Sequence, residues 1–371
     1  MEAAGQTRIV RAEDVAHMGI TEVIRHMPYV FSQYRKLVRA IKRDRPDIAI
    51  LIDFPDVNFR LAKHCKRLGI PVIWFVSPQL WAWKRRRLRW VQQRVSKMLV
   101  IFPFEEPFYR NRGVDAEFVG HPLAALPLPA ISREDYADEL GLDPLATWIA
   151  LLPGSRAKEV QATLPAMLRT EEHLDPISAP YEFVIPVAST VPAELIQRIV
   201  AEWKDSRSHL PSVEVHLVPD AREALYHARA AIVASGTATV QALTIGNPFV
   251  VVYRVSSLTF ALAKRLISYP AEIGDSAKLK DADGNLPIAM VNLIAGRRIV
   301  PELLNERFTA QNLAAAIKPL LDDTSERAQM IADLAEVRAK LLPPARSGPP
   351  ATPIVRVCDA IEDLLRATPA N

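Results

Sequence analysis

Residues 48–76 read "IAILIDFPDVNFRLAKHCKRLGIPVIWFV" and give the strongest indication of the fold. The apolar run 48–52 has the length of a buried strand and stops at Asp53. Apolar residues at helical spacing then lead to Gly69, and a second apolar run follows at 71–76. A strand, a helix and a second strand in this order predict a βαβ unit, and with it a parallel sheet.

The same alternation continues beyond a proline-rich segment, "GHPLAALPLPAISRED" at 120–135. This segment shows neither the helical nor the strand periodicity of apolar residues, which indicates a linker. We expect strands at 147–152, 182–187, 213–218, 230–234 and 248–253. We expect helices from 157, at 193–203, near 222–228, and at 237–245, 310–321, 326–341 and 354–365.

This pattern predicts an α/β protein with two Rossmann-like, doubly wound domains that face a cleft, followed by C-terminal helices. We place the first domain at 1–125 and the second at 126–345. The remaining segment, 346–371, holds most of the break "PPARSGPPATP" at 343–353 and the helix that follows it. We expect its helix to dock on the first domain or on a second subunit, which allows a homodimer.

The composition is that of soluble globular domains, with 49% hydrophobic and 24% charged residues among 371. A formal charge of +4 is too small to indicate nucleic acid as partner, although it allows a local site for an anionic ligand. The two cysteines lie far apart and the eight histidines form no HExxH pattern, so we expect no metal site and no cofactor. No apolar run approaches the ~18 residues needed to span a bilayer, and we expect a cytoplasmic protein.

The stretch "LLPGSRAKEV" at 151–160 places Gly154, Ser155 and Arg156 between a predicted strand and a predicted helix. A helix N-terminus offers free N–H groups to an anion, glycine lets the backbone approach it, and arginine adds a fork of donors. The pattern therefore indicates a phosphate-binding turn. An ordinary turn with a solvated arginine remains the alternative.

A second stretch, "VASGTATVQAL" at 233–243, repeats this arrangement with Ser235, Gly236 and Thr237. Gln241 lies one turn into the following helix, where its side chain could reach a ribose hydroxyl. The alternatives are that Thr237 only caps the helix and that Gln241 is solvated. Two anion-binding turns in one domain favour a nucleotide diphosphate more than either turn alone.

Two further polar residues occupy positions where ligands of α/β proteins bind. Asp53 follows a predicted parallel strand, at the edge where such sheets bind ligands, and could act as a general base. His121, in "GHPL", lies near the predicted domain boundary. For both residues a structural role is the alternative.

Six stretches, in order along the chain, together resemble the lipid-A-disaccharide synthase family of inverting GT-B glycosyltransferases. They are "VSPQLWAWKRRR", "FPFEEPFY", "FVGHPLA", "LLPGSRAKEV", "ASGTATVQALTIGNPFVVVYR" and "MVNLIAGRRIVPELLNE". The resemblance implies that UDP-2,3-diacylglucosamine donates its sugar to 2,3-diacylglucosamine 1-phosphate, giving the lipid A disaccharide 1-phosphate and UDP. It also implies a location on the cytoplasmic face of the inner membrane of Gram-negative bacteria.

The resemblance assigns roles to residues of the matching motifs. It implies that Asp53 is the base and that Arg156 and the 235–237 turn hold the diphosphate. It matches Asn292 to a family position tied to activity and places Glu302 near the expected nucleotide site. We also count His121 and Gln241 among the expected substrate contacts.

The first motif lies in a cationic and aromatic segment, residues 76–97, which holds three tryptophans and seven lysines or arginines. Because both implied substrates carry acyl chains, we expect this segment to contact an anionic membrane surface and the lipid acceptor. The residues concerned are Trp81, Trp83, Arg85, Arg86 and Arg87. The alternative is that the tryptophans are core residues and the arginines a solvated face.

The sequence also departs from the family. The strand and glycine-rich turn with which the family begins would lie upstream of Met1, so we expect this chain to lack that unit. Gln241 stands where glutamate is usual. A UDP-GlcNAc 2-epimerase-like enzyme and a non-catalytic lipid- or nucleotide-binding remnant are the alternative functions, and no nucleic-acid-binding motif accompanies the basic segment.

Overall fold

The computed structural model describes residues 5, 7–10, 27–174, 181–206, 213–344 and 351–367. Its contacts divide the chain into two compact units, Met1–Gly120 with Pro343–Asn371, and His121–Leu342. Each unit has one sheet in which all paired strands are parallel, so the predicted α/β class is confirmed. Of the predicted break at 343–353, residues 345–350 lie outside the described residues.

The first unit contains a sheet with the strand order β1-β2-β3-β4. Its strands are β1 (Ala49–Ile52), β2 (Val72–Phe75), β3 (Lys97–Val100) and β4 (Ala116–Phe118). Its helices are α3 (Met27–Asp44), α4 (Pro55–Arg67), η2 (Arg85–Arg87), α5 (Leu88–Arg94), α6 (Glu105–Arg110) and α17 (Pro353–Ala367). The predicted βαβ unit is confirmed as β1, α4 and β2, and the described strands of this sheet follow one another in a single direction rather than in the predicted double winding.

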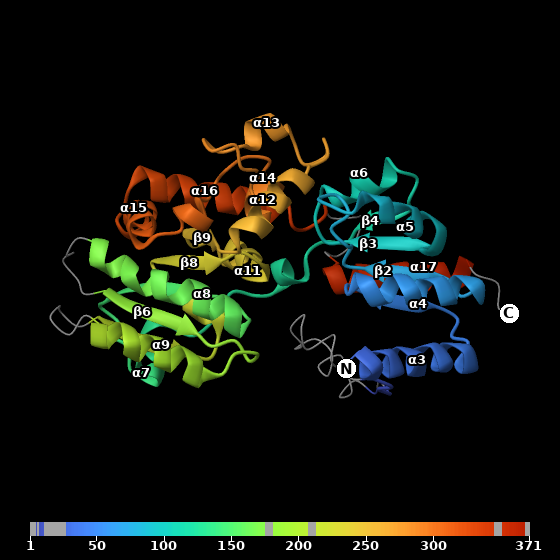
Figure 1. The fold of residues 1–371 in the computed structure, drawn as a ribbon, viewed down its shortest axis with the longest axis horizontal. Coiled ribbons are helices and arrows are strands. Elements are labelled where there is room, and N and C mark those ends of the chain that lie inside the picture. Colours follow the sequence, from blue (N-terminus) through green and yellow to red (C-terminus); the bar gives the residue numbers. More distant parts are fainter. Residues whose placement is uncertain are drawn as a thin grey trace. The chain divides into compact units, whose positions relative to one another are not determined.

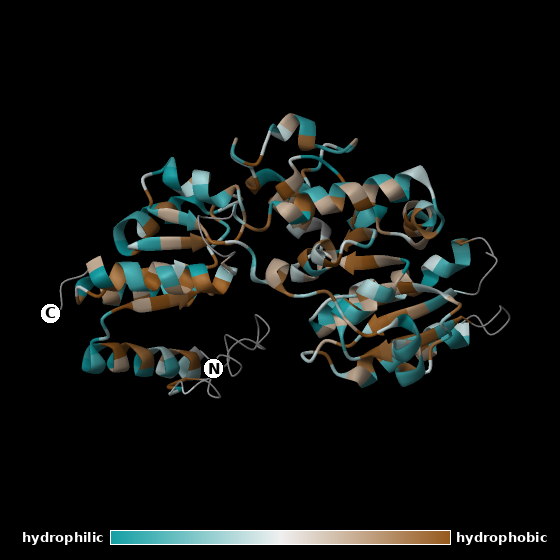
Figure 2. Cartoon of the chain, turned by 180° about the vertical axis from the view of Figure 1, so that it is seen from behind, coloured by the Kyte–Doolittle hydropathy of each residue, from teal (hydrophilic) through white to brown (hydrophobic). Residues whose placement is uncertain are grey.

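Aromatic packing joins the sheet of the first unit to its helices. Trp74 of β2 is fully buried, and its ring lies 4.7 Å from that of Phe59 on α4. Trp90 of α5 packs edge-on against the same phenylalanine at 5.4 Å. Figure 2 shows the strands of both units as mainly hydrophobic and the helices as mixed, which is the pattern expected of sheets covered by amphipathic helices.

The second unit contains a six-stranded sheet with the order β10-β9-β8-β5-β6-β7. Its strands are β5 (Thr147–Leu152), β6 (Tyr181–Pro186), β7 (Glu214–Val218), β8 (Ala230–Ala234), β9 (Phe249–Tyr253) and β10 (Glu302–Leu304). From β5 the chain moves outward to β6 and β7, returns to β8 beside β5, and moves the other way to β9 and β10. This sheet is therefore doubly wound, as predicted, with its switch point between β5 and β8.

Helices and 3₁₀ turns connect the strands of the second unit. They are η3 (Pro122–Ala125), α7 (Arg133–Leu140), α8 (Ala157–Leu168), η4 (Arg169–His173), α9 (Ala193–Ser206), α10 (Ala221–His227), α11 (Thr237–Ile245), α12 (Ser257–Leu266), α13 (Ser276–Leu279), α14 (Met290–Ala295), η5 (Asn305–Arg307), α15 (Ala310–Leu321) and α16 (Ser325–Ala339). Figure 1 shows α8 and α9 together on one side of this sheet. Helix α7 begins inside the segment predicted as a linker, because Ser132 caps it by accepting from the Asp135 amide.

Candidate active site

The two predicted anion-binding turns lie next to each other in the second unit. β5 and β8 are parallel neighbours, and the register pairs Leu152 with Val233 at their carboxyl ends. The turn 153–156 follows β5 and leads into α8, whereas the turn 235–236 follows β8 and leads into α11. Open α/β sheets bind ligands at such a switch point, because two helix N-termini meet there.

Side-chain hydrogen bonds hold the backbone of the first turn. The Thr163 hydroxyl donates to the carbonyl of Pro153 at 2.6 Å, and the Thr190 hydroxyl donates to that of Ser155 at 2.6 Å. Gly154 has φ of +120°, which disfavours any residue with a β-carbon. Arg156 occupies the N-cap position of α8, and its guanidinium is 78% exposed. The turn therefore presents an exposed cation at a helix N-terminus.

The second turn has a backbone that only glycine adopts readily. Gly236 has φ 154° and ψ −156° and is the N-cap of α11, so it has no side chain to cap the helix. Thr237 is the first helical residue and is exposed, which shows that it is not the cap considered as an alternative. Gln241 lies one turn further along, half-buried. The first amides of α11 are thus placed to bind an anion.

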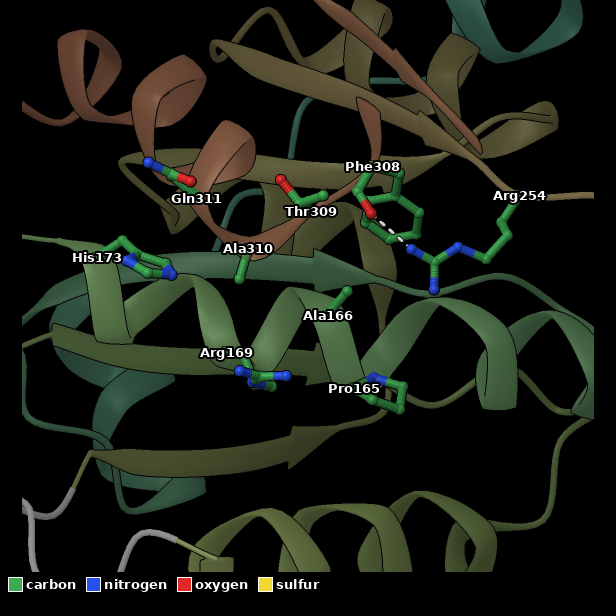
Figure 3. A pocket seen from close by; sticks show the side chains of 9 residues that line it. All are labelled: Pro165, Ala166, Arg169, His173, Arg254, Phe308, Thr309, Ala310 and Gln311. Carbon is green, nitrogen blue, oxygen red and sulfur yellow. Dashed lines mark hydrogen bonds between the residues drawn. The ribbon is translucent and has the colours of Figure 1, made fainter. Parts of the chain in front are cut away.

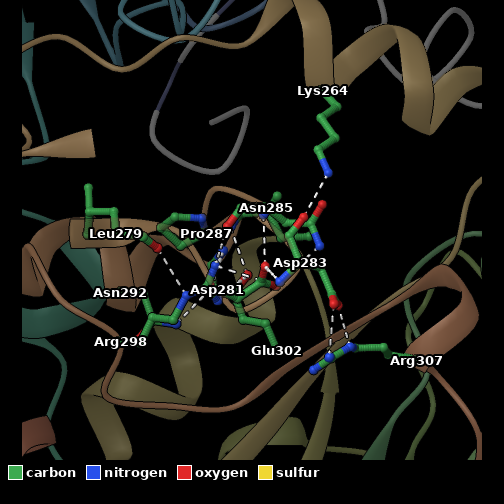
Figure 4. A network of polar contacts seen from close by, with 12 residues as sticks. Lys264, Leu279, Asp281, Asp283, Asn285, Pro287, Asn292, Arg298, Glu302 and Arg307 are labelled. Atoms are coloured by element: carbon green, nitrogen blue, oxygen red, sulfur yellow. Dashed lines mark hydrogen bonds and ion pairs between the residues drawn. The ribbon is translucent and has the colours of Figure 1, made fainter. Parts of the chain in front are cut away.

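Asn292 and Glu302, which we predicted to bind substrate, are buried and bonded to the protein's own groups. Asn292 on α14 is fully buried, and its amide group donates to the Val300 carbonyl at 3.0 Å and to Glu302 Oε1 at 2.7 Å. Its oxygen accepts from the amides of Ile299 at 2.8 Å and Val300 at 3.1 Å. All the hydrogen-bonding capacity of this side chain is used inside the protein, and Figure 4 shows Asn292 in one network with Glu302 and Arg298.

Glu302 completes the same network from β10. Its side chain is 0% exposed, accepts from the Ile288 amide at 2.9 Å and the Ala289 amide at 3.3 Å, and lies 3.8 Å from Arg298 Nη1. Burial raises the pKa of this carboxyl, and its hydrogen bonds and Arg298 oppose the shift. The network therefore fixes the segment between α14 and β10, and Arg298 is a member that sequence reasoning missed.

His121, a further predicted substrate contact, is also buried and bonded to the protein. It is 7% exposed, and its Nδ1 accepts from the Leu123 amide at 3.2 Å at the start of η3. Its backbone amide donates to the Leu341 carbonyl at 2.8 Å. Burial lowers its pKa to about 4, so the ring is neutral near pH 7.

In the first unit, Asp53 lies in a strained turn at the end of β1. Asp53 and Phe54 have φ of 43° and 44°, both left-handed, a conformation that costs ~1–3 kcal/mol for each residue other than glycine. The Asn58 side chain holds the turn by donating to the carbonyls of Asp53 at 2.6 Å and Ile52 at 3.1 Å. The Asp53 side chain is exposed. Strain of this kind concentrates at functional sites. A sequence does not display backbone angles, so sequence analysis could not predict this strain.

Trp81 is a core residue, which corrects its predicted contact with a membrane. It is 2% exposed, and its Nε1 donates to Glu105 Oε1 at 3.0 Å. Glu105 also accepts from the Ser77 hydroxyl at 2.6 Å and from the amides of Ile101 at 3.3 Å and Phe102 at 3.1 Å. Burial raises the pKa of Glu105 to about 7. This buried carboxylate ties the segment after β2 to the segment after β3.

The other residues of the cationic segment lie closer to solvent. Trp83 is 46% exposed, with the Lys84 ammonium 4.0 Å from its ring centre. Arg85 and Arg86 are exposed, whereas Arg87 forms an ion pair of 2.7 Å with Asp56 of α4. Arg87 is therefore partly engaged within the first unit.

A cavity of the second unit lies along the middle and C-terminal part of α8 and was not predicted. It has a volume of about 450 Å³ and is lined by residues of α8, η4 and the start of α15, and by Arg254 (Figure 3). Arg254 donates to the carbonyls of Phe308 at 2.5 Å and Ala162 at 3.1 Å and stacks on the Phe308 ring. Arg169, another cation of its wall, pairs with Glu172. These cations are engaged by the protein, so we assign the cavity no ligand.

Comparison with known proteins gives the family. Residues 1–343 match the family model described as lipid-A-disaccharide synthetase. The chain belongs to the lipid-A-disaccharide synthase family. The lipid-A-disaccharide synthase of Acidobacterium capsulatum is 48% identical to this chain over 99% of it and 87% of the relative. The family predicted from the six motifs is thereby confirmed.

Solved structures resemble this member of the synthase family in fold. The calicheamicin glycosyltransferase CalG4 matches with a TM-score of 0.53 at 16% identity, over 100% of this chain and 88% of that chain. A putative UDP-N-acetylglucosamine 2-epimerase from Listeria monocytogenes matches with a TM-score of 0.55 at 13% identity, over 98% and 83%. At these identities the likeness concerns the fold alone, which agrees with the predicted GT-B class. Within the described ranges, no helix has the length and apolar content to cross a membrane.

Proposed function

We propose that this chain is a glycosyltransferase that condenses UDP-2,3-diacylglucosamine with 2,3-diacylglucosamine 1-phosphate to the lipid A disaccharide 1-phosphate and UDP. Membership of the lipid-A-disaccharide synthase family supports this reaction. The structural observation that carries the proposal is the pair of turns at the carboxyl ends of β5 and β8. Two adjacent helix N-termini suit the two phosphates of a nucleotide diphosphate.

In this proposal Arg156 and the 235–237 turn hold the diphosphate. The exposed guanidinium of Arg156 can reach phosphate oxygens, and the amides at the start of α11 face the ligand edge of the sheet. Gln241, one turn into α11, contacts the ribose through its amide group. No cofactor or metal takes part in the proposed reaction.

Asp53 of the first unit is the proposed general base. Its carboxylate takes the proton of the acceptor's 6-hydroxyl, whose oxygen attacks C1 of the donor sugar while the bond from C1 to the diphosphate oxygen breaks. The electron pair of that bond leaves with UDP, and attack from the opposite face gives the β linkage. The left-handed turn held by Asn58 fixes the backbone from which the carboxylate extends, and Arg156 stabilises the charge on the leaving diphosphate.

The first unit is also the proposed contact with the inner membrane, on its cytoplasmic face. Trp83, Arg85 and Arg86 present an exposed aromatic ring and cations, which suit the interface and the phosphates of an anionic lipid surface. On α3, Tyr29 and Phe31 are 41% and 45% exposed. The homodimer expected from the proline break stays a prediction.

An assay of UDP release with each substrate alone and with both substrates together tests the proposed function. Purified chain in detergent micelles should release UDP only when UDP-2,3-diacylglucosamine and the acceptor phosphate are both present. An epimerase would instead convert water-soluble UDP-GlcNAc into its 2-epimer without an acceptor. Consumption of UDP-GlcNAc with no UDP release from the acylated pair would reject the transferase and favour the epimerase.

A further inference from the structure

The diphosphate turn of the second unit already holds an anion, which is the carboxylate of Glu159. The Ser155 amide donates to Glu159 Oε2 at 3.3 Å, and Arg156 Nη1 lies 2.6 Å from Oε1. Arg156 is assigned above to the nucleotide diphosphate, and the Ser155 amide belongs to the same turn. A phosphate and this carboxylate cannot use the same donors at once.

The turn is built closely around this carboxylate. A β-carbon on Gly154 would lie 2.8 Å from Glu159 Oε2 and 2.9 Å from Glu159 Cβ. The glycine is therefore required by the approach of Glu159 itself as well as by its positive φ. Burial raises the pKa of Tyr253, at the end of β9, and the charge of Glu159 raises it further whereas that of Arg156 lowers it. Both charges thus act at the ligand edge of the sheet.

The position of Glu159 in α8 differs from that of a simple capping residue. It is the third residue of the helix, and a glutamate there usually accepts from the amide of the N-cap residue. Here the N-cap is Arg156, and the carboxylate reaches one residue further, to the Ser155 amide. It lies where a bound phosphate would meet the turn.

We propose that Glu159 is a displaceable anion that occupies the diphosphate donors of the empty enzyme and leaves them when UDP or the UDP-sugar binds. The side chains of Arg156 and Glu159 are 78% and 40% exposed. Ion pairs this exposed are weak and exchange readily. Glu159 thereby lowers the affinity for UDP and hastens release of this product. The inference rests on the proposed function, because it concerns the same diphosphate site.

Titration calorimetry of the full chain with UDP and with uridine tests this role. Glu159→Gln should tighten UDP binding by up to about fivefold, the limit set by an exposed ion pair. Glu159→Ala should tighten it at least as much, since no side-chain acceptor remains. Binding of uridine, which lacks phosphate, should not change. Glu194→Gln is the matched control, because Glu194 is an exposed glutamate in the first turn of α9.

The possible results separate this inference from the function on which it rests. Unchanged or weaker UDP binding by both Glu159 variants, in samples that melt like the parent chain, would overturn the inference, and Glu159 would then serve to align Arg156. Failure of the unmodified chain to bind UDP would overturn the proposed function and the inference with it. Tighter binding of uridine would also count against displacement of a carboxylate by phosphate.

Discussion

Replacing Asn292 with alanine should destabilise the second unit rather than remove a substrate contact. The substitution removes Asn292 Oδ1, which accepts from the backbone amides of Ile299 and Val300. Both amides then stay buried beside a small cavity without this acceptor. Each unsatisfied buried amide costs about 1–3 kcal/mol. It also removes the donor to Glu302 Oε1, although that carboxylate keeps two backbone amides.

Two unsatisfied amides give an expected loss of roughly 2–6 kcal/mol in the free energy of unfolding. For a domain of 150–250 residues this lowers the melting temperature by about 4–24 °C. Differential scanning calorimetry of the full chain measures the shift in the transition of the second unit. Asn312→Ala is the matched control, because Asn312 is exposed and its side chain donates to one carbonyl, at 2.9 Å.

Activity distinguishes the two possible roles of Asn292. If the residue is structural, the transfer rate below the melting transition should fall only in proportion to the folded fraction. The apparent UDP affinity should fall in the same proportion. A variant that melts within about 2 °C of the parent chain while losing transfer would refute the structural role and restore the direct contact first predicted.

Three further predictions follow from the geometry. Asp53→Asn should lower the transfer rate by ~10²-fold or more and leave UDP affinity, measured by calorimetry, unchanged; retained transfer would exclude Asp53 as the base. Burial lowers the pKa of His121 from 6.5 to about 4, so the unfolded chain binds more protons between these values, and stability falls as the pH drops through this window. Asparagine keeps an acceptor near the position of Nδ1 and does not titrate. In urea unfolding, the free energy of unfolding of His121→Asn should therefore fall by roughly 3 kcal/mol less than that of the parent chain between pH 7 and pH 4. Equal falls in the variant and the parent chain would contradict the assignment. Arg85→Glu with Arg86→Glu should weaken sedimentation with vesicles of anionic lipid, and equal binding by the double variant and the parent chain would exclude this surface.

Much of the fold could be predicted because its strands are short apolar runs bounded by breakers. β5, β8, α11 and α15 begin and end at the predicted residues. Helix α12 was missed because it is short and leaves its apolar residues uncovered: Leu262 and Leu266 are 56% and 60% exposed. The Ser256 hydroxyl caps this helix by accepting from the Thr259 amide at 3.2 Å.

The candidate site was predicted less completely than the fold. The two anion-binding turns follow from glycine and small polar residues between a strand and a helix, a local pattern that a sequence displays. Burial is not local, so Trp81, His121, Asn292 and Glu302 were assigned to ligands although the protein's own groups satisfy them. The spacing of three between Arg156 and Glu159 could have indicated their ion pair.

Formation of the disaccharide tests the central claim most directly. The purified chain would be incubated with UDP-2,3-diacylglucosamine and 2,3-diacylglucosamine 1-phosphate in detergent micelles, beside Asp53→Asn, and the products measured by mass spectrometry. We expect the tetraacyl disaccharide phosphate and an equal amount of UDP from the parent chain, and little of either from the variant. A folded parent chain that binds UDP but forms no disaccharide would contradict the proposed synthase activity and favour the nucleotide-binding remnant.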